Sequence, residues 1–345
     1  MKHLANLLFS RSFRSYLVGA TLLGVALSVT ASETTPTDDA TSQQITVGQE
    51  LFNDKQLSKD GAVSCATCHI PARAFTDGLP VAIGVNHRSG TRNTPSLATL
   101  TLSNDTSFFW DGRRESLKEA VLDPLTNPVE MGLDNKAHLI EKLSRATGSD
   151  GKDLGVRTLD QAAIALTAYV RSLHLPLSDY DRFRTGHDPH ALSPRAQEGL
   201  ALFSGKARCA QCHSLQGSRA TLTDHRFHRT GVGINDVEQN LPQLTTEIIA
   251  QSLSGIELGN HIATHAQEAQ LGRFNVTHDV VDIETFRTPS LRAIASTAPY
   301  MHDGSIKTLD EAVDREVYYR SLSAGHPLNL SVEERQDLLA FLYAL

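Results

Sequence analysis

Three features are scarce in this chain of 345 residues: long apolar runs, blocks of basic residues and cysteines. Beyond residue 31 no stretch is apolar enough to span a bilayer, which takes roughly 20 consecutive residues. No block of Lys and Arg occurs, so we expect no nucleic-acid partner. Strand-like alternation of polar and apolar residues is also rare, and we therefore predict a mainly α fold.

The first 31 residues have the pattern of a secretory signal. A basic start precedes the apolar run 17–29, and small residues follow at a cleavage position, Val29-Thr30-Ala31. Because the run is short for an anchor, we expect export to the periplasm and no membrane span after cleavage. Cleavage would take the formal charge from −7 to −10, since three basic residues and no acidic ones are removed. Residues 32–44 are polar, and we expect a flexible lead-in there.

All four cysteines belong to two copies of one motif, Cys65-Ala-Thr-Cys68-His69 and Cys209-Ala-Gln-Cys212-His213. In C-x-x-C-H each thiol can add to a haem vinyl group, and the adjacent His reaches the iron as its proximal ligand. Paired zinc motifs usually lie about 15–20 residues apart, whereas 144 positions separate these copies. Thioredoxin-like pairs need no following His, and a disulfide within C-x-x-C closes little chain. We therefore predict two covalent haem c groups.

The two halves of the chain resemble one another beyond these motifs. The sequence TPSL occurs at 94–97 and again at 288–291, and Trp110-Asp111-Gly112 corresponds to His302-Asp303-Gly304. We predict that an amphipathic helix closes each half, at 159–173 and at 331–345. Such self-similarity indicates two cytochrome c-like haem domains related by an internal repeat, which we place at 45–185 and 186–345. An insertion at 221–285 in the second half is expected to be loop with some helix.

Four further segments, together with both C-x-x-C-H motifs, resemble the bacterial di-haem cytochrome c peroxidases and the related MauG proteins. These segments are GTRNTP at 90–95, FWDGR at 109–113, NPVEM at 127–131 and APYMHDG at 298–304. The resemblance implies an H2O2-dependent oxidoreductase whose N-terminal haem meets hydrogen peroxide and whose C-terminal haem passes or stores electrons. It also implies a protein partner, which is either an electron donor (a small cytochrome or a cupredoxin) or a protein substrate, as for MauG.

The resemblance also implies roles for individual residues. Trp110 matches the tryptophan that relays electrons between the haems. Glu130 matches the distal glutamate, whose carboxylate can move a proton from one peroxide oxygen to the other. Asn93, Thr297 and Pro299 match the positions that hold Ca²⁺ between the haems, and their amide and carbonyl oxygens suit that ion.

This chain departs from the family at the N-terminal haem. Val85 stands where many relatives carry a removable distal His, and valine cannot bind iron. We therefore expect an open iron site, with His87 as an exposed loop residue. An alternative function, a di-haem electron-transfer cytochrome without peroxide chemistry, needs two fully ligated irons and is disfavoured by Val85.

A second departure concerns the sixth ligand of the C-terminal haem, which is a Met in many relatives. After signal removal only Met131 and Met301 remain, and neither stands at the expected place. On a helix that begins at residue 309, positions 309, 313, 316 and 320 share one face, which directs Glu316 to the haem. Tyr318 or Tyr319 could take this place instead if the alignment contains an insertion. The sequence leaves these three candidates open.

Overall fold

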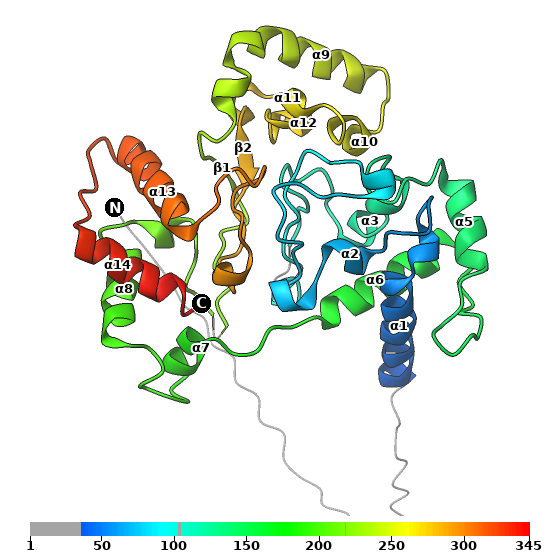
Figure 1. Ribbon diagram of the computed structural model, residues 1–345, viewed down its shortest axis with the longest axis horizontal. Helices are drawn as coiled ribbons and strands as arrows, with labels where there is room; N and C mark the ends of the chain where they lie inside the picture. The colour runs from blue at the N-terminus through cyan, green and yellow to red at the C-terminus, as the bar shows by residue number, and fades with distance from the viewer. Residues whose placement is uncertain (1–35, 103–104, 218) are drawn as a thin grey trace, which may run out of the picture. The chain divides into compact units, whose positions relative to one another are not determined.

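Helices predominate in the chain, as the scarcity of strand patterns predicted. The computed structural model describes residues 36–102, 105–217 and 219–345 (Figure 1), so the predicted signal 1–31 lies outside the described residues. Helix α1 (Pro36–Asn53) makes the predicted lead-in helical from Pro36 onward. From Asp38 to Leu345 the chain forms one compact unit. None of the helices in the described segments has the length and apolar character needed to cross a membrane.

The N-terminal half is assembled around the contact between α1 and α6. A side-chain Cβ at Gly48 of α1 would lie 2.0 Å from the carbonyl oxygen of Ala165, so only glycine allows this close approach. Thr158 and Gln161 cap α6 reciprocally, and this helix occupies the predicted 159–173 segment. After α1, the helices of this half are α2 (Cys65–Cys68), α3 (Leu117–Ala120), α4 (Asp123–Thr126), α5 (Lys136–Ser144) and α6 (Leu159–Ser172).

The C-terminal half repeats this construction with α8 and α14. A Cβ at Gly199 of α8 would lie 2.0 Å from the carbonyl oxygen of Asp337 in α14. Ser193 caps α8 ahead of Pro194, and Ser331 forms the predicted capping box with Glu334 at the start of α14. The helices of this half outside the insertion are α7 (Asp179–Arg184), α8 (Pro194–Ser204), α13 (Leu309–Ala324) and α14 (Val332–Leu342).

Two buried side-chain groups attach α7 to the C-terminal half. Tyr180 belongs to the same hydrophobic cluster as Phe203 and Phe341. Asp181 accepts two hydrogen bonds from the Arg292 guanidinium, at 2.7 and 2.9 Å, and both side chains are almost fully buried. By its packing, α7 therefore belongs with the second core, although the sequence boundary was placed after it.

The insertion in the second half builds a small core of its own. Strand β1 (Phe227–Arg229) pairs antiparallel with β2 (Thr285–Arg287). Beyond this sheet, buried Leu244, Ile248 and Phe274 hold together four helices, which lie near one another in Figure 1. The prediction of loop with some helix understated this order, because the apolar residues that stabilise it are scattered over short elements. The four helices are α9 (Leu241–Leu253), α10 (Leu258–Ile262), α11 (Ala266–Ala269) and α12 (Phe274–Thr277).

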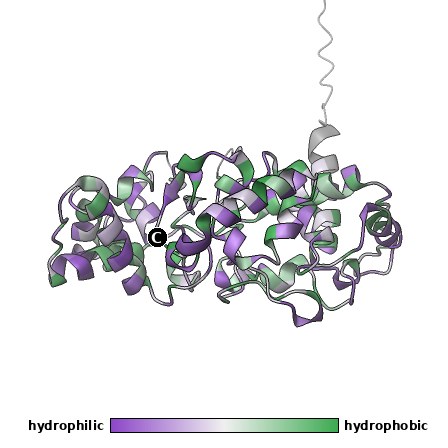
Figure 2. Ribbon diagram, turned by 90° about the horizontal axis from the view of Figure 1, so that it is seen from above, coloured by the Kyte–Doolittle hydropathy of each residue, from purple (hydrophilic) through white to green (hydrophobic). Residues whose placement is uncertain are grey.

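Most helices carry both hydrophilic and hydrophobic residues, and Figure 2 shows the two colours alternating along them. Such helices pack one side against a core and leave the other to solvent. On α14, for example, Leu338 and Phe341 are buried, whereas Glu334 is exposed enough to pair with Lys206 at the surface. The buried faces of these helices form the cores of the two halves, and these cores enclose one cavity.

Candidate functional site

Both C-x-x-C-H motifs open onto one continuous cavity between the two cores. Burial raises the pKa of Cys65, Cys68 and Cys209 to about 12, which keeps these thiols protonated. The four cysteines are free in the structure, so neither motif forms a disulfide. The cavity lining includes all six predicted haem-attachment residues, namely Cys65, Cys68, His69, Cys209, Cys212 and His213.

The two motif histidines are oriented in the same way. The Nδ1 atom of His69 lies 2.9 Å from the carbonyl oxygen of Phe75, and that of His213 lies 2.9 Å from the carbonyl oxygen of Leu222. A carbonyl only accepts, so each Nδ1 donates and each Nε2 keeps its lone pair, as an iron ligand requires. Burial lowers the pKa of both imidazoles, that of His213 to about 4, so both are neutral at pH 7.

The TPSL repeats hold the loops that supply these carbonyl groups. The Ser96 hydroxyl donates to the carbonyl oxygen of Ala74 at 2.5 Å, one residue before Phe75. The Ser290 hydroxyl donates to the carbonyl oxygen of Thr221 at 2.7 Å, one residue before Leu222. Phe75 and Leu222 both have left-handed backbones, with φ of 62° and 55°. Each serine therefore helps to hold the carbonyl group that orients the motif histidine.

In the N-terminal half, Glu130 also lines the cavity, from a loop. Its Oε1 accepts a hydrogen bond from the Asn127 amide at 2.8 Å. Burial raises the pKa of Glu130, and the positive charge of Arg113 partly opposes this shift. The loop is held tightly, because a Cβ at Gly84 would lie 2.4 Å from the Glu130 carbonyl oxygen, to which the Val85 N–H also donates at 2.9 Å.

The two residues considered in place of a distal His both lie outside the cavity lining. Val85 is 1% exposed and packs in the N-terminal core. His87 is exposed to solvent, as expected from the sequence. On this side the cavity is bounded instead by Gly84, Ala120 and Glu130.

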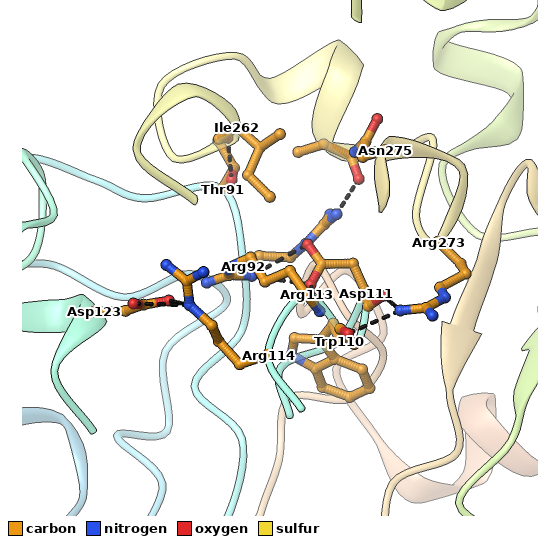
Figure 3. Close-up of polar contacts among 12 residues, drawn as sticks. Thr91, Arg92, Trp110, Asp111, Arg113, Arg114, Asp123, Ile262, Arg273 and Asn275 are labelled. Atoms are coloured by element: carbon orange, nitrogen blue, oxygen red, sulfur yellow. Dashed lines mark hydrogen bonds and ion pairs between the residues drawn. The ribbon is translucent and has the colours of Figure 1, made fainter. Parts of the chain in front are cut away.

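Trp110 lines the cavity where the two halves meet. Its indole Nε1 donates to the carbonyl oxygen of Asn93 at 2.8 Å, and its own carbonyl accepts from the Arg287 N–H at 2.8 Å. Asn93 in turn donates its N–H to the carbonyl oxygen of His302 at 2.8 Å. Figure 3 shows Trp110 close to Arg92 and Arg113. The FWDGR and GTRNTP segments are thus hydrogen-bonded to segments of the second half.

The three candidate calcium ligands all line this cavity. The Asn93 amide nitrogen lies 2.9 Å from the carbonyl oxygen of Leu79 and 3.4 Å from that of Pro299. The side-chain nitrogen and oxygen of Asn are assigned from the groups around them. With a cation bound at this point, the Asn93 amide would be flipped, and Oδ1 would occupy the position of the nitrogen. Thr297 lies two residues before Pro299, and its hydroxyl donates to the carbonyl oxygen of Ile294. This set of neutral oxygen donors fits Ca²⁺.

The three candidates for the sixth ligand of the second haem differ in position. Glu316 lines the cavity, and its pKa is raised by burial and lowered in part by Arg320, whose Nε lies 3.7 Å from Oε2. Tyr318 is 61% exposed, and the Tyr319 hydroxyl donates to the carbonyl oxygen of Gly231. Neither tyrosine lines the cavity. The predicted helix face does so in full, through Leu309, Val313, Glu316 and Arg320.

Two methionines, Met131 and Met301, also border the cavity. Met131 lies next to Glu130 and is 2% exposed, whereas Met301 lies in the tight turn that Tyr300 and Ile306 close with an isolated β-bridge. Met301 belongs to the C-terminal half, so it competes with Glu316 for the place of the sixth ligand. Its position in the sequence alone had not suggested this role.

Sequence reasoning missed a group of arginines around the cavity. Among the described residues these side chains have buried N–H groups without a hydrogen-bond partner, and a buried guanidinium N–H without an acceptor is unfavourable. Two haems would bring four propionate carboxylates, which arginine binds well, so the residues present fit these groups. Arg92 and Arg113 lie inside segments of the family resemblance, but no pattern distinguished them from surface arginines. The atoms are Arg92 Nε and Nη1, Arg113 Nε, Arg287 Nε and Arg320 Nε.

Known proteins similar to this chain belong to one family. Residues 42–189 match the family described as di-haem cytochrome c peroxidase. The chain is 34% identical to the cytochrome-c peroxidase IdrP2 of Denitromonas iodatirespirans (88% of this chain, 82% of the relative). It is 32% identical to the methylamine utilization protein MauG of Methylorubrum extorquens (88% and 78%).

Solved structures have the same fold. A MauG-like protein associated with microbial copper homeostasis superposes with a TM-score of 0.67 at 29% identity, over 88% of this chain and 89% of that one. The di-haem peroxidase BthA from Burkholderia thailandensis has a TM-score of 0.66 at 23% identity, over 88% and 85% of the two chains.

Proposed function

This chain belongs to the di-haem cytochrome c peroxidase family and is a peroxide-dependent oxidoreductase with haem cofactors; on that premise, we propose that its two halves are haem c domains with different tasks. Residues 45–185 would hold the haem that meets hydrogen peroxide, and residues 186–345 the haem that passes or stores electrons, with α7 packing on the second. The haem irons supply the redox chemistry that side chains lack. In the first domain Cys65 and Cys68 form the thioethers and His69 the proximal ligand, and in the second these are Cys209, Cys212 and His213.

Glu130 carries the proposal, because it is a buried carboxylate of the N-terminal half that lines the cavity, whereas Asp105, which also lines it, is paired with Arg287 and His225. Its carboxylate takes a proton from one oxygen of hydrogen peroxide and returns it to the departing oxygen. The Asn127 amide holds one carboxylate oxygen in place at 2.8 Å. Burial raises the pKa of Glu130 above its ordinary value, which suits a group that must both accept and release a proton.

Trp110 is placed to carry electrons between the two domains. Its hydrogen bond to Asn93 fixes the indole, and its backbone is bound to Arg287 of the second half. Ca²⁺ held by Asn93, Thr297 and Pro299 would strengthen the same junction. Both groups keep the distance between the domains constant, on which electron transfer depends.

In the second domain Glu316 is proposed as the sixth ligand, because it alone of the three candidates lines the cavity. An anionic oxygen ligand favours ferric iron over ferrous iron, whereas a thioether raises the potential. The second haem would then store oxidising equivalents, as in the MauG-like function, rather than accept electrons at high potential.

Export and partners complete the proposal. Residues 1–31 would direct the chain to the periplasm and be removed. The reducing equivalents come from a small cytochrome or cupredoxin, or from the side chains of a protein substrate. The formal charge of −10 that remains after cleavage suits a basic partner surface.

Spectroscopy of the ferric holoprotein tests the proposal against the electron-carrier alternative. We expect a high-spin haem signal in electron paramagnetic resonance, and a rapid optical change on adding one equivalent of H2O2. Two low-spin haems that do not respond to peroxide would instead support a di-haem carrier.

A further inference from the structure

A group of nitrogen and oxygen donors lies in the insertion, outside the cavity. His261 of α10, His265 between the helices and Glu268 of α11 each offer one ligand atom, and these atoms lie within 4.8 Å of one another. The Nε2 of His261 contacts a carboxylate oxygen of Glu268 directly. The two imidazole rings stack at a centroid distance of 3.9 Å and an angle of 16°. None of the three side chains lines the cavity.

The hydrogen bonds of His265 leave its other nitrogen available as a ligand. Its Nδ1 lies 2.7 Å from the carbonyl oxygen of His261 and 3.0 Å from the Thr264 hydroxyl. A carbonyl only accepts, so Nδ1 carries the proton and Nε2 keeps its lone pair. Metal-binding histidines typically donate their second ring N–H to a carbonyl in this way.

Burial gives the site a closed side and an open side. Glu268 is 6% exposed and the His261 side chain 13%, whereas His265 is exposed to solvent. A hydrated ion can therefore approach from the side of His265 and reach the buried carboxylate. The Asn275 amide donates to the Glu268 carbonyl oxygen at 2.8 Å, which holds the backbone of α11 behind the ligand.

We propose that His261, His265 and Glu268 bind a divalent transition-metal ion of the zinc or copper(II) class. Two imidazoles and one carboxylate are the donor set of borderline ions, and water completes the coordination. Calcium is not the expected ion, because it prefers six to eight oxygen ligands.

The bound ion would connect α10 to α11 beside the cavity wall. Gly259 and Ile262 of α10 line the cavity, as does Ala263 at its C-terminal end, and the Ile262 carbonyl oxygen accepts from the Thr91 hydroxyl at 2.8 Å (Figure 3). A metal on the far side of this short helix would hold that wall in place. The proposal is independent of the peroxidase assignment, since none of these ligands belongs to the haem pockets.

Metal analysis of the purified holoprotein tests the proposal. With excess Ca²⁺ present, Zn²⁺ is titrated by calorimetry, and bound metal is measured by mass spectrometry after gel filtration. We expect one equivalent of zinc per chain beyond iron and calcium. Cu²⁺ in place of zinc should give a type 2 electron paramagnetic resonance signal with hyperfine structure from two nitrogens.

Variants identify the ligands. His265→Ala removes an exposed side chain and should weaken Zn²⁺ binding at least about tenfold, the lower end of the effect of losing even a supporting residue of a metal site. Glu268→Gln keeps the shape of the side chain and should weaken it similarly. His326→Ala, an exposed histidine elsewhere, is the matched control. Unchanged haem spectra confirm folding in each variant. No zinc above the iron and calcium content, or equal affinity in His265→Ala, Glu268→Gln and the control, would overturn the proposal.

Discussion

The two halves of the cavity hold their motif histidines through the same contacts and differ in the glutamate that lines each half. The Nδ1 contact is 2.9 Å in both halves, and the ring of Phe52 lies 6.3 Å from that of His69, compared with 6.5 Å between Phe203 and His213. A Cβ at Gly48 or at Gly199 would lie 2.0 Å from a carbonyl oxygen of the facing helix. The glutamates that line the cavity differ in their setting, since Glu130 lies on a loop and Glu316 near the middle of α13. A repeated frame can therefore hold two sites of different chemistry.

The largest expected difference between the halves concerns the two glutamates. Glu130→Gln should slow the reaction with H2O2 about 10²- to 10⁴-fold, the usual range for general acid–base assistance. Glu316→Gln is the matched control and should leave this rate close to that of the unchanged protein. Stopped-flow absorbance measures both rates. Equal slowing in the two variants would contradict the division of labour between the halves.

The pH dependence of the same rate should separate the glutamates further. Burial raises the pKa of Glu130 above its ordinary value, and only the carboxylate form can accept a proton from peroxide. The rate should therefore fall about tenfold per pH unit as pH drops below that raised pKa. This limb should be absent in Glu130→Gln and kept in Glu316→Gln. A limb that survives in Glu130→Gln would assign the titration to another group.

Loss of the sixth ligand should affect only the C-terminal haem. Glu316→Ala should change the spectrum of this haem and raise its reduction potential by on the order of 100 mV, because an anionic ligand is lost. The double Tyr318→Phe, Tyr319→Phe variant should change neither property. Met301→Leu tests the competing residue, and a spectral change in that variant that Glu316→Ala lacks would transfer the assignment to Met301.

The glycine contacts should contribute similarly to the stability of both halves. Gly48→Ala and Gly199→Ala each place a methyl group 2.0 Å from a carbonyl oxygen, and we expect each to lower the free energy of unfolding by about 1–3 kcal/mol. Gly90→Ala is the control, since the nearest atom to its Cβ would be 3.6 Å away. Urea denaturation of the holoprotein measures the change. A large loss in only one half would show that the two helix pairs are not equivalent.

The smallest effects are expected from the serines of the TPSL repeats. Ser96→Ala and Ser290→Ala each remove one hydrogen bond to a loop, worth about 1 kcal/mol, and leave the carbonyl that orients the histidine less restrained. Each variant should shift the potential of its own haem by about 20–60 mV, since 59 mV corresponds to a factor of ten for one electron. Spectroelectrochemistry resolves the two haems, and shifts of both haems in one variant would mean that the loops are coupled.

Much of the fold and of the site followed from local patterns. The helices predicted to close the two halves, at 159–173 and 331–345, are present as α6 and α14 and begin after the caps Thr158 and Ser331. The face of α13 that contains Glu316 was predicted from helical spacing and lines the cavity. The insertion was harder to predict, because its core is assembled from short elements whose apolar residues show no regular period.

The prediction of covalent haem attachment rests on the sequence by itself, through two C-x-x-C-H motifs, their repeat, and the absence of a His at position 85. These properties depend on residue identity and short spacing, which are readable without a fold. Only the tertiary structure separated Glu316 from Tyr318 and Tyr319, showed that arginines around the cavity have buried N–H groups without a hydrogen bond, and brought His261, His265 and Glu268 together. Burial and convergence of side chains depend on how distant segments pack, and no local pattern encodes them.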